Sequence, residues 1–440
     1  MLTTEIDAHG FAIVTLDMAD RSMNVLDWNA GKALDQTFEN LLGDDTVKAI
    51  IITSAKPTFI AGADLAIMAD FQAPDETPGS AAQRIAPLGD MMRRLETGGK
   101  PVVAAAPGTA LGGGLELMLA CHYRIAADDP KAAFGLPEVK LGLLPGAGGT
   151  QRLPRMIGIA EALPLLLSGK SLSATEALRA GILDEVVPEH ALLDAARAAL
   201  KDGRVSPVVP WDQKGFAPPG PAPQSLEVGN LFAMKNASVL AKTQGNYPAP
   251  KAILSCVYEG TRLPMDKALK VEREYFATLV MAEVPHAMIR TLFFGRLAAE
   301  KAGRTPGDPA SAFVKAGRAA YIAEGLAMLR EGTPEVLIEN AALSFGMARG
   351  PIALAREAGH DLAAGPSDNA PPDVADVQDR LISAQVRAAT EARGDVDPAI
   401  ADLDAIIGWG FPAWTGGPLA LQENALARGE ASQLVRGAPA

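Results

Sequence analysis

The stretch that decides the fold begins with Leu111-Gly-Gly-Gly-Leu-Glu116, continues through Gly135-Leu-Pro-Glu138 and ends in Pro145-Gly-Ala-Gly-Gly-Thr-Gln-Arg-Leu153. Glu116 lies in a segment, 115–121, whose other residues are apolar or small. A carboxylate buried without a partner is costly, or it takes up a proton. The glycines before it open a helix whose first N–H groups face a developing negative charge. Two carboxylates beside such an anion hole suit acid–base chemistry next to a carbonyl, so we expect an enzyme.

The two carboxylates are too far apart along the chain for spacing alone to make them neighbours. Both lie at glycine-rich turns, where backbone can approach a ligand. In one dry pocket their proton affinities would separate, so that one holds a proton and the other polarises water. A solvated turn residue remains the alternative for Glu138, and it suits Glu116 less well because leucines flank that residue.

A third segment, Phe59-Ile-Ala-Gly-Ala-Asp-Leu65, follows a predicted strand. Asp64 is a typical helix N-cap, which is a purely structural role. The same turn leaves the N–H of Ala63 free to point at an oxyanion, opposite the N–H of Gly113. Two converging backbone donors stabilise an enolate oxygen, so we expect an oxyanion hole here.

The composition narrows the function classes. A chain of 440 residues with 48% hydrophobic residues predicts two or three well-filled domains. The net charge of −12 argues against nucleic acid as the main partner. The two cysteines, Cys121 and Cys256, are too few for a disulfide framework or a structural zinc site. Residues 1–6 do not resemble a signal peptide, and the most apolar window, 101–120, contains glycine, proline and Glu116, so we expect a cytoplasmic protein without a membrane span.

Hydrophobic periodicity divides the chain. Residues 1 to about 200 alternate strand and helix patterns, which predicts an α/β domain. The expected strands are 12–16, 47–53 and 102–106, and the expected helices include 31–42 and 86–95. Residues 203–224 are proline-rich and read as a linker, and the pattern is helical from about 225 onward.

The helical half contains a weak repeat. Gly350-Pro-Ile-Ala-Leu354 recurs as Gly417-Pro-Leu-Ala-Leu421. Chance similarity between two loops is the alternative interpretation.

The sequence lacks the motifs of several other kinds of site, namely nucleotide-binding, serine-nucleophile and metal sites. The segment Gly146-Ala-Gly-Gly-Thr-Gln151 is one glycine short of a dinucleotide-binding fingerprint and follows no clear strand. The sequence has no Walker pattern and no serine nucleophile elbow, and its five histidines lack metal-ligand spacing. We therefore expect neither a bound metal nor an NAD site.

Residues 1 to about 200 resemble the enoyl-CoA hydratase/isomerase (crotonase) superfamily in three motifs: Ala61–Leu65, Ala110–Leu117 and Gly135–Leu153. The resemblance implies a crotonase domain, a ββα spiral, acting on a 2-enoyl-CoA thioester without a cofactor. It implies that the N–H groups of Ala63 and Gly113 hold the thioester oxygen. By the same resemblance Glu116 activates water and Glu138 handles the proton of the α-carbon. The remaining residues of these motifs that would contact substrate are Gly62, Asp64, Leu65, Gly112, Gly114 and Pro137.

The rest of the chain resembles the bacterial multifunctional fatty-acid oxidation α-subunit type. The matching segments are Pro210–Phe216, Tyr247–Leu254, Met288–Phe294 and Gly408–Pro418. The resemblance implies a crotonase domain at 1–200, a linker with helices at 201–302, and an all-α remnant of a 3-hydroxyacyl-CoA dehydrogenase C-terminal domain, with two shortened repeats, at 303–440.

The chain departs from that family where the Rossmann domain should lie. The segment Ala299–Arg304 passes almost directly into Phe313, which leaves no room for a strand, a glycine-rich turn and a helix. We therefore expect the dehydrogenase activity to be absent.

Three hypotheses remain open at this point. The first is a 2-enoyl-CoA hydratase of β-oxidation, with Δ3–Δ2-enoyl-CoA isomerase activity on the same carboxylates as a variant. The second is a non-catalytic acyl-CoA-binding subunit of a β-oxidation complex. The third keeps the enzyme and changes its reaction, because one fold hosts several chemistries. Candidate partners are a second copy of the chain, a thiolase and a separate 3-hydroxyacyl-CoA dehydrogenase.

Overall fold

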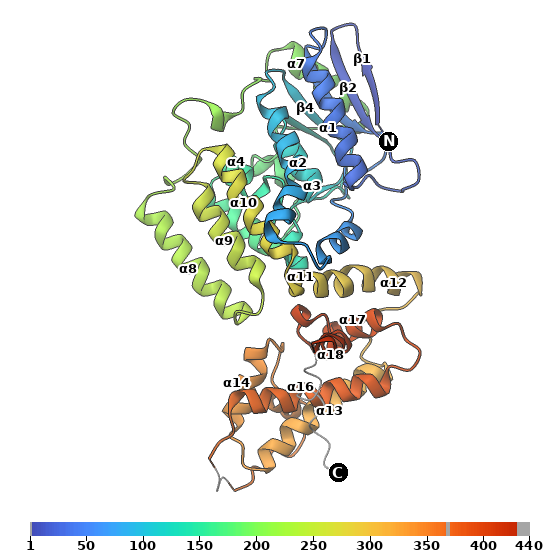
Figure 1. Ribbon diagram of the computed structural model, residues 1–440, viewed down its shortest axis with the longest axis vertical. Helices are drawn as coiled ribbons and strands as arrows, with labels where there is room; N and C mark the ends of the chain where they lie inside the picture. The colour runs from blue at the N-terminus through green and yellow to red at the C-terminus, as the bar shows by residue number, and fades with distance from the viewer. Residues whose placement is uncertain (1, 367–369, 429–440) are drawn as a thin grey trace. The chain divides into compact units, whose positions relative to one another are not determined.

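The computed structural model describes residues 2–366 and 370–428 (Figure 1). The chain forms two compact units. The first unit comprises Met1–Ala237 and Ala249–Met281, and the second comprises Ser238–Pro248 and Ala282–Ala440.

A six-stranded sheet forms the centre of the first unit, with strand order β1-β2-β3-β4-β6-β8. Only β1 is antiparallel to its neighbour; the other pairs are parallel. Every residue of β4 is buried, as expected for a parallel strand covered on both faces. A second, two-stranded sheet pairs β5 with β7. The strands are β1 (Leu2–Ile6), β2 (Phe11–Leu16), β3 (Ala49–Ser54), β4 (Val102–Ala106), β5 (Ala110–Leu111), β6 (Tyr123–Ala127), β7 (Phe134–Gly135) and β8 (Glu185–Val187).

Helices α1 (Trp28–Gly43) and α2 (Pro78–Thr97) of the first unit begin at side-chain caps. The side chain of Asp27 accepts the N–H of Ala30 at the start of α1, and Thr77 caps α2 reciprocally with Ser80. The predicted strands and helices are confirmed, and both helices start earlier than predicted because their caps lie upstream of the apolar pattern. The helices are α1 (Trp28–Gly43), α2 (Pro78–Thr97), α3 (Gly113–Leu119), α4 (Gly149–Ile157), α5 (Ile159–Ser168), α6 (Ala174–Arg179), α7 (Leu192–Lys201), α8 (Leu226–Thr243), α9 (Pro248–Gly260) and α10 (Met265–Val280), with 3-10 turns η1 (Leu65–Gln72), η2 (Glu138–Leu141), η3 (Glu189–Ala191) and η4 (Pro210–Asp212). The end of α8 and the first residue of α9 fall within Ser238–Pro248, which belongs to the second unit.

Helix α10 belongs to the first unit, although the sequence placed it within a linker at 201–302. It packs against α2 and α4. Arg93 of α2 donates to Asp266 of α10 at 2.7 Å. The two units group the elements by their contacts, and the domain boundaries at residues 200 and 302 stay a prediction.

The second unit is helical, and every strand in the described ranges ends before residue 188. The prediction of an all-α region after the α/β domain is confirmed. Its elements are α11 (Glu283–Met288), the π-helical η5 (Ile289–Gly295), α12 (Arg296–Lys301), α13 (Ala312–Arg330), α14 (Glu335–Phe345), α15 (Pro351–Glu357), α16 (Val374–Ala392), α17 (Pro398–Trp409), η6 (Ala413–Thr415) and α18 (Pro418–Ala427).

The two Gly-Pro segments of the predicted repeat share a capping geometry. Glu339 of α14 accepts the N–H groups of Ile352 and Ala353 at the start of α15, at 2.8 and 3.1 Å. Asp402 of α17 accepts those of Leu419 and Ala420 at the start of α18, at 2.7 and 3.1 Å. In each copy a carboxylate on the preceding helix satisfies otherwise unpaired donors at the start of the next one.

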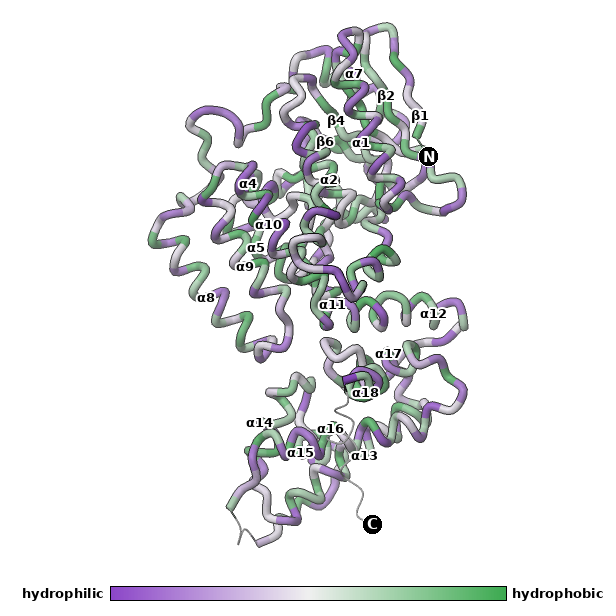
Figure 2. The backbone as a smooth tube through the Cα atoms, in the orientation of Figure 1, coloured by the Kyte–Doolittle hydropathy of each residue, from purple (hydrophilic) through white to green (hydrophobic). Residues whose placement is uncertain are grey.

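Hydrophilic and hydrophobic residues alternate along the long helix α8 (Figure 2). Across the described ranges, no helix has the length and apolar character that a membrane crossing requires.

Candidate active site

The three motif segments lie side by side in the first unit. The N–H of Leu111 donates to the carbonyl of Ile60 at 3.0 Å, which joins the 59–65 segment to the start of the glycine triplet. The N–H of Gly112 donates to the carbonyl of Gly135 at 2.9 Å, which joins the triplet to the turn before Glu138. Backbone pairing therefore brings together the residues that the sequence proposed for one site.

Two glycines of the triplet are required by these close approaches. Gly112 has φ of 51°, which a residue with a side chain rarely adopts. A Cβ on Gly112 would lie 2.9 Å from Oε1 of Glu138, and one on Gly114 would lie 2.4 Å from the carbonyl oxygen of Ile60. Helix α3 and Glu138 can approach this corner only because side chains are missing there.

Two backbone donors at this corner, the N–H groups of Ala63 and Gly113, take no part in the local backbone pairing. The N–H of Leu26 donates to Gly62 and the N–H of Asp64 donates to Leu26, both at 2.9 Å. Because donors alternate in direction along an extended segment, the N–H of Ala63 points away from Leu26. Gly113 is the first residue of α3, so its N–H has no partner within the helix. These are the two groups that the sequence assigned to the oxyanion hole.

The other residues proposed for the site contribute to its shape. The side chain of Asp64 accepts the N–H of Ala66 at 3.0 Å as the N-cap of η1, which begins at Leu65, and it pairs with Arg21 at 2.7 Å. Burial opposes ionisation of Asp64, but these two contacts outweigh it and keep its pKa below the ordinary value. Pro137 directly precedes η2. Asp64 is therefore engaged in local structure, as its capping role suggests.

Glu116 is buried, with 3% of its surface exposed. Its Oε1 accepts the N–H groups of Ala147 and Gly149 at 2.7 and 2.8 Å. Burial raises the pKa of Glu116, and the two N–H groups and the charge of Arg152 offset only part of this. The Pro145–Leu153 motif thus supplies direct partners for the first carboxylate.

Glu138 has a different environment. Its Oε2 is buried and has no hydrogen-bond partner in the described part of the chain. Burial first, and then the charge of Glu116, raise the pKa of Glu138 well above the ordinary value. The two carboxyl groups therefore share one environment and have unequal partners. Such an arrangement favours a carboxylate at Glu116 and a protonated acid at Glu138.

A third buried carboxylate, which the sequence analysis did not identify, comes from α10. Oε1 of Glu272 accepts the N–H of Gly148 at 2.5 Å, and Oε2 accepts the N–H and hydroxyl of Thr150 at 2.9 and 2.5 Å. Burial and the charge of Glu116 raise the pKa of Glu272 to about 8. One signal was available: Glu272 lies at helical spacing between Ala268 and Phe276 and interrupts their apolar stripe.

A buried ion pair supports the same loop. Nε of Arg152 donates to Oε1 of Glu96 at 2.7 Å, and both side chains are fully buried. The guanidinium also donates to the carbonyl of Ala147 at 2.7 Å. The pair therefore joins α2 to α4 and holds one peptide of the loop that contacts Glu116.

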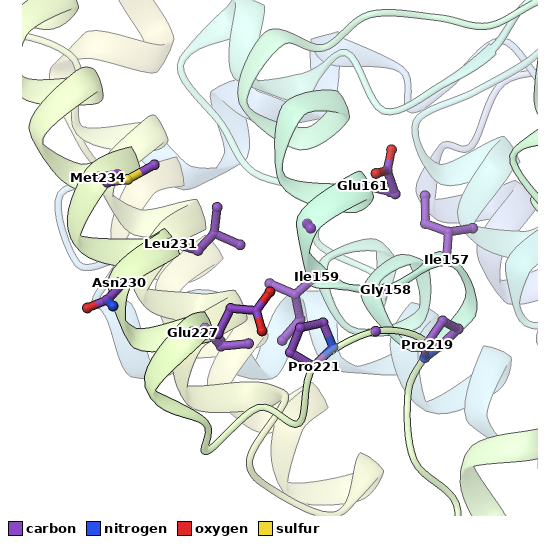
Figure 3. A pocket seen from close by; sticks show the side chains of 13 residues that line it. Ile157, Gly158, Ile159, Glu161, Pro219, Pro221, Glu227, Asn230, Leu231 and Met234 are labelled. Carbon is purple, nitrogen blue, oxygen red and sulfur yellow. The ribbon is translucent and has the colours of Figure 1, made fainter.

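A cavity of about 530 Å³ lies elsewhere in the first unit, between the start of α5, residues 219–221 and α8 (Figure 3). Ile159, Pro221 and Leu231 gather around it, and none of the residues proposed for the site lines it.

Across the described ranges, no group of three or more His, Cys, Asp or Glu side chains is arranged to hold a metal ion.

The comparisons with known proteins agree on the first unit. The model of the enoyl-CoA hydratase/isomerase family matches residues 8–204. The fatty acid oxidation complex subunit alpha of Shewanella frigidimarina is 40% identical over 289 residues, which are 65% of this chain and 39% of that protein. The subunit of Shewanella halifaxensis is 40% identical over 288 residues, with the same coverage. The chain thus spans about two fifths of the length of the curated relatives it matches.

Two solved structures are also similar. The enoyl-CoA hydratase from Bacillus anthracis is 26% identical, with a TM-score of 0.42, over 69% of this chain and 97% of that one. Pseudomonas aeruginosa DspI is 35% identical, with a TM-score of 0.41, over 47% of this chain and 81% of that one. Residues 8–204 of this chain therefore match the enoyl-CoA hydratase/isomerase family.

Proposed function

We propose that the chain hydrates trans-2-enoyl-CoA thioesters to 3-hydroxyacyl-CoA in fatty-acid β-oxidation. The observation that carries the proposal is that Glu116 and Glu138 lie close enough for their charges to interact, have unequal hydrogen-bond partners, and share a corner with the N–H groups of Ala63 and Gly113. The match to the family and the names of the curated relatives support the substrate class.

The chemistry follows from the positions of these groups. The N–H groups of Ala63 and Gly113 would hold the thioester oxygen and stabilise the enolate charge that develops on it. Glu116 would take a proton from water as the water oxygen bonds to the β-carbon. Glu138 would deliver its proton to the α-carbon as the enolate collapses. The product gains one water, and solvent exchange returns both carboxyl groups to their starting states.

The unpartnered Oε2 of Glu138 also favours a second candidate, the Δ3–Δ2 isomerisation of an enoyl-CoA. In its ionised form, Glu138 could take a proton from the α-carbon of a Δ3-enoyl-CoA and return it to the γ-carbon as the double bond moves, which regenerates the carboxylate. This reaction needs no attacking water, so it would depend on Glu138 more strongly than on Glu116.

The proposal includes no cofactor and no dehydrogenase step. Ten residues, 302–311, separate α12 from α13, which is too short for a βαβ unit of about 30 residues. Acyl-CoA is the proposed substrate, and the product would pass to a separate dehydrogenase and a thiolase. We place the chain in the cytoplasm, with a homo-oligomer as one assembly to test.

The test supplies the purified chain with crotonyl-CoA and, separately, with a long-chain enoyl-CoA. Hydration is measured as the loss of enoyl absorbance. We expect Glu116→Gln and Glu138→Gln each to slow turnover by about 10²–10⁴-fold, because each removes a general acid or base. Glu39→Gln on the exposed face of α1 is the matched control and should retain wild-type turnover.

Wild-type turnover in both active-site variants would sink the catalytic assignment. Binding of acyl-CoA without turnover would point to the non-catalytic subunit. Loss of isomerisation in Glu138→Gln, with little change in Glu116→Gln, would point to the isomerase.

A further inference from the structure

The loop at 145–150 is held between two carboxylates by alternate N–H groups. Those of Ala147 and Gly149 donate to Glu116, and those of Gly148 and Thr150 donate to Glu272. We propose that Glu272 is a positioning residue that orients Glu116 through this loop, an inference that rests on the hydratase function proposed above.

The alternation couples the two carboxylates mechanically. Consecutive peptide groups share a backbone, so rotating the N–H of Gly148 or Thr150 also turns the neighbouring N–H groups that bind Glu116. Without Glu272 the N–H of Thr150, a fully buried residue, would be left without a partner. The loop would then turn to satisfy that donor, and Glu116 would lose its alignment.

Glu272 is itself firmly placed. It is 1% exposed, and α10 packs against both α2 and α4. Arg152 holds the carbonyl of Ala147 at 2.7 Å, so the loop is fixed by a donor from α4 as well as by an acceptor from α10. Glu272 makes its hydrogen bonds to Gly148 and Thr150, within this loop and the first turn of α4, which makes it a positioning residue rather than a catalytic one.

If Glu272 positions Glu116, the active site depends on a residue outside the part of the chain that the family model matches. Glu272 lies outside residues 8–204, the part matched by the family model. Helix α10 therefore contributes to the alignment of the general base, in addition to its packing against α2 and α4 within the first unit.

The experiment uses the full chain with Glu272→Gln. The substitution keeps the volume but turns an NH₂ group toward the N–H of either Gly148 or Thr150, so one loop contact is lost. Glu274→Gln, on the exposed face of the same helix, is the matched control. The readouts are kcat and KM for crotonyl-CoA and the hydrogen exchange of the amides in 145–150.

We expect Glu272→Gln to lower kcat by up to about 10²-fold, the typical effect of a small misalignment, with KM unchanged because the oxyanion donors are untouched. Hydrogen exchange of the backbone amides should accelerate in residues 145–150 and stay at the wild-type rate elsewhere in the chain. The control should match the wild type in all three readouts. If Glu272→Gln does not fold, Thr150→Val removes the hydroxyl bond to Glu272, together with the hydroxyl's contacts to Cys256 and Gln151, and keeps the N–H bond to Glu272. It should give a smaller loss of kcat together with faster hydrogen exchange of the loop amides.

Wild-type kcat in a folded Glu272→Gln chain would overturn the inference and leave the hydratase proposal standing. A fall in kcat without faster exchange in 145–150 would also overturn it, because the loop would not be the route. If the wild-type chain shows no hydratase activity, the proposed function falls, and the exchange of the loop amides alone decides whether Glu272 holds the loop.

Discussion

The glycine triplet shows how much geometry three small residues can impose. Gly112 supplies a backbone conformation with positive φ, and Gly114 allows α3 to contact the backbone of Ile60. Gly113 differs from both, because a Cβ there would meet only the far end of a flexible side chain, Cδ1 of Leu26 at 2.8 Å. Its proposed contribution is its N–H group, which makes that group testable separately from the fold.

The N–H of Gly113 can be removed with proline. Proline is well tolerated at the first position of a helix, where the N–H has no helical partner. We expect Gly113→Pro to lower turnover of crotonyl-CoA by about 10²–10³-fold, the usual effect of removing one oxyanion donor. Gly113→Ala keeps the N–H and meets the same Leu26 side chain, so it should retain most of the activity. Equal turnover of the proline and alanine variants, both folded, would remove Gly113 from the mechanism.

At the scale of elements, the site depends on helices that bury charge. Glu96 of α2 and Arg152 of α4 form a fully buried pair, and Glu272 of α10 lies buried close enough to Glu116 for their charges to interact. A buried pair that is well bonded gives little net stability, but it specifies how two helices meet. The interior of the first unit is therefore more polar than the apolar run at 115–121 suggests, and its stability should depend on pH.

The titration of Glu272 sets the sign of that dependence. Burial raises its pKa from 4.5 to about 8, so the folded chain holds this proton more tightly than the unfolded chain. The resulting stability is fully present below pH 4.5 and is lost as the pH rises through about 8. The groups that act on this carboxyl are Glu116, Thr150, Arg152 and the backbone N–H of Gly148.

Glu272→Gln removes the titration. We expect the unfolding free energy of the wild type, relative to that of the variant, to fall between pH 4.5 and about 8. Urea unfolding at a series of pH values measures both curves, and Glu274→Gln should run parallel to the wild type. A wild-type-to-variant difference that stays constant with pH would contradict the raised pKa.

For the whole molecule, both sheets lie in the first unit, and the described residues of the second unit form helices joined by turns and loops, without a strand. A dinucleotide site needs a strand, a glycine-rich turn and a helix whose N-terminus faces the pyrophosphate. The short connection at 302–311 offers none of these. Under the proposed function, the chain performs the hydration step, and a separate dehydrogenase would oxidise the product.

The corresponding prediction concerns products. Supplied with crotonyl-CoA and NAD⁺, the purified chain should accumulate 3-hydroxybutyryl-CoA and form no NADH. Adding a separate 3-hydroxyacyl-CoA dehydrogenase to the same mixture should start NADH formation, which controls for the presence of product. NADH formed in proportion to product by the chain alone, or tight NAD⁺ binding in calorimetry, would refute the proposal.

The sequence by itself determined the local elements and the motif residues. The apolar run at 102–106, the Asp64 cap and the glycine triplet each depend on neighbours within a few residues, so spacing and residue type were sufficient to predict them. Only the tertiary structure decided what surrounds the two glutamates. Glu272 accepts the N–H of Thr150, and Glu96 pairs with Arg152, although each pair is far apart in the sequence. No rule based on residue spacing predicts such pairs. Tertiary packing selects them because a buried carboxylate must find hydrogen-bond donors wherever the fold provides them.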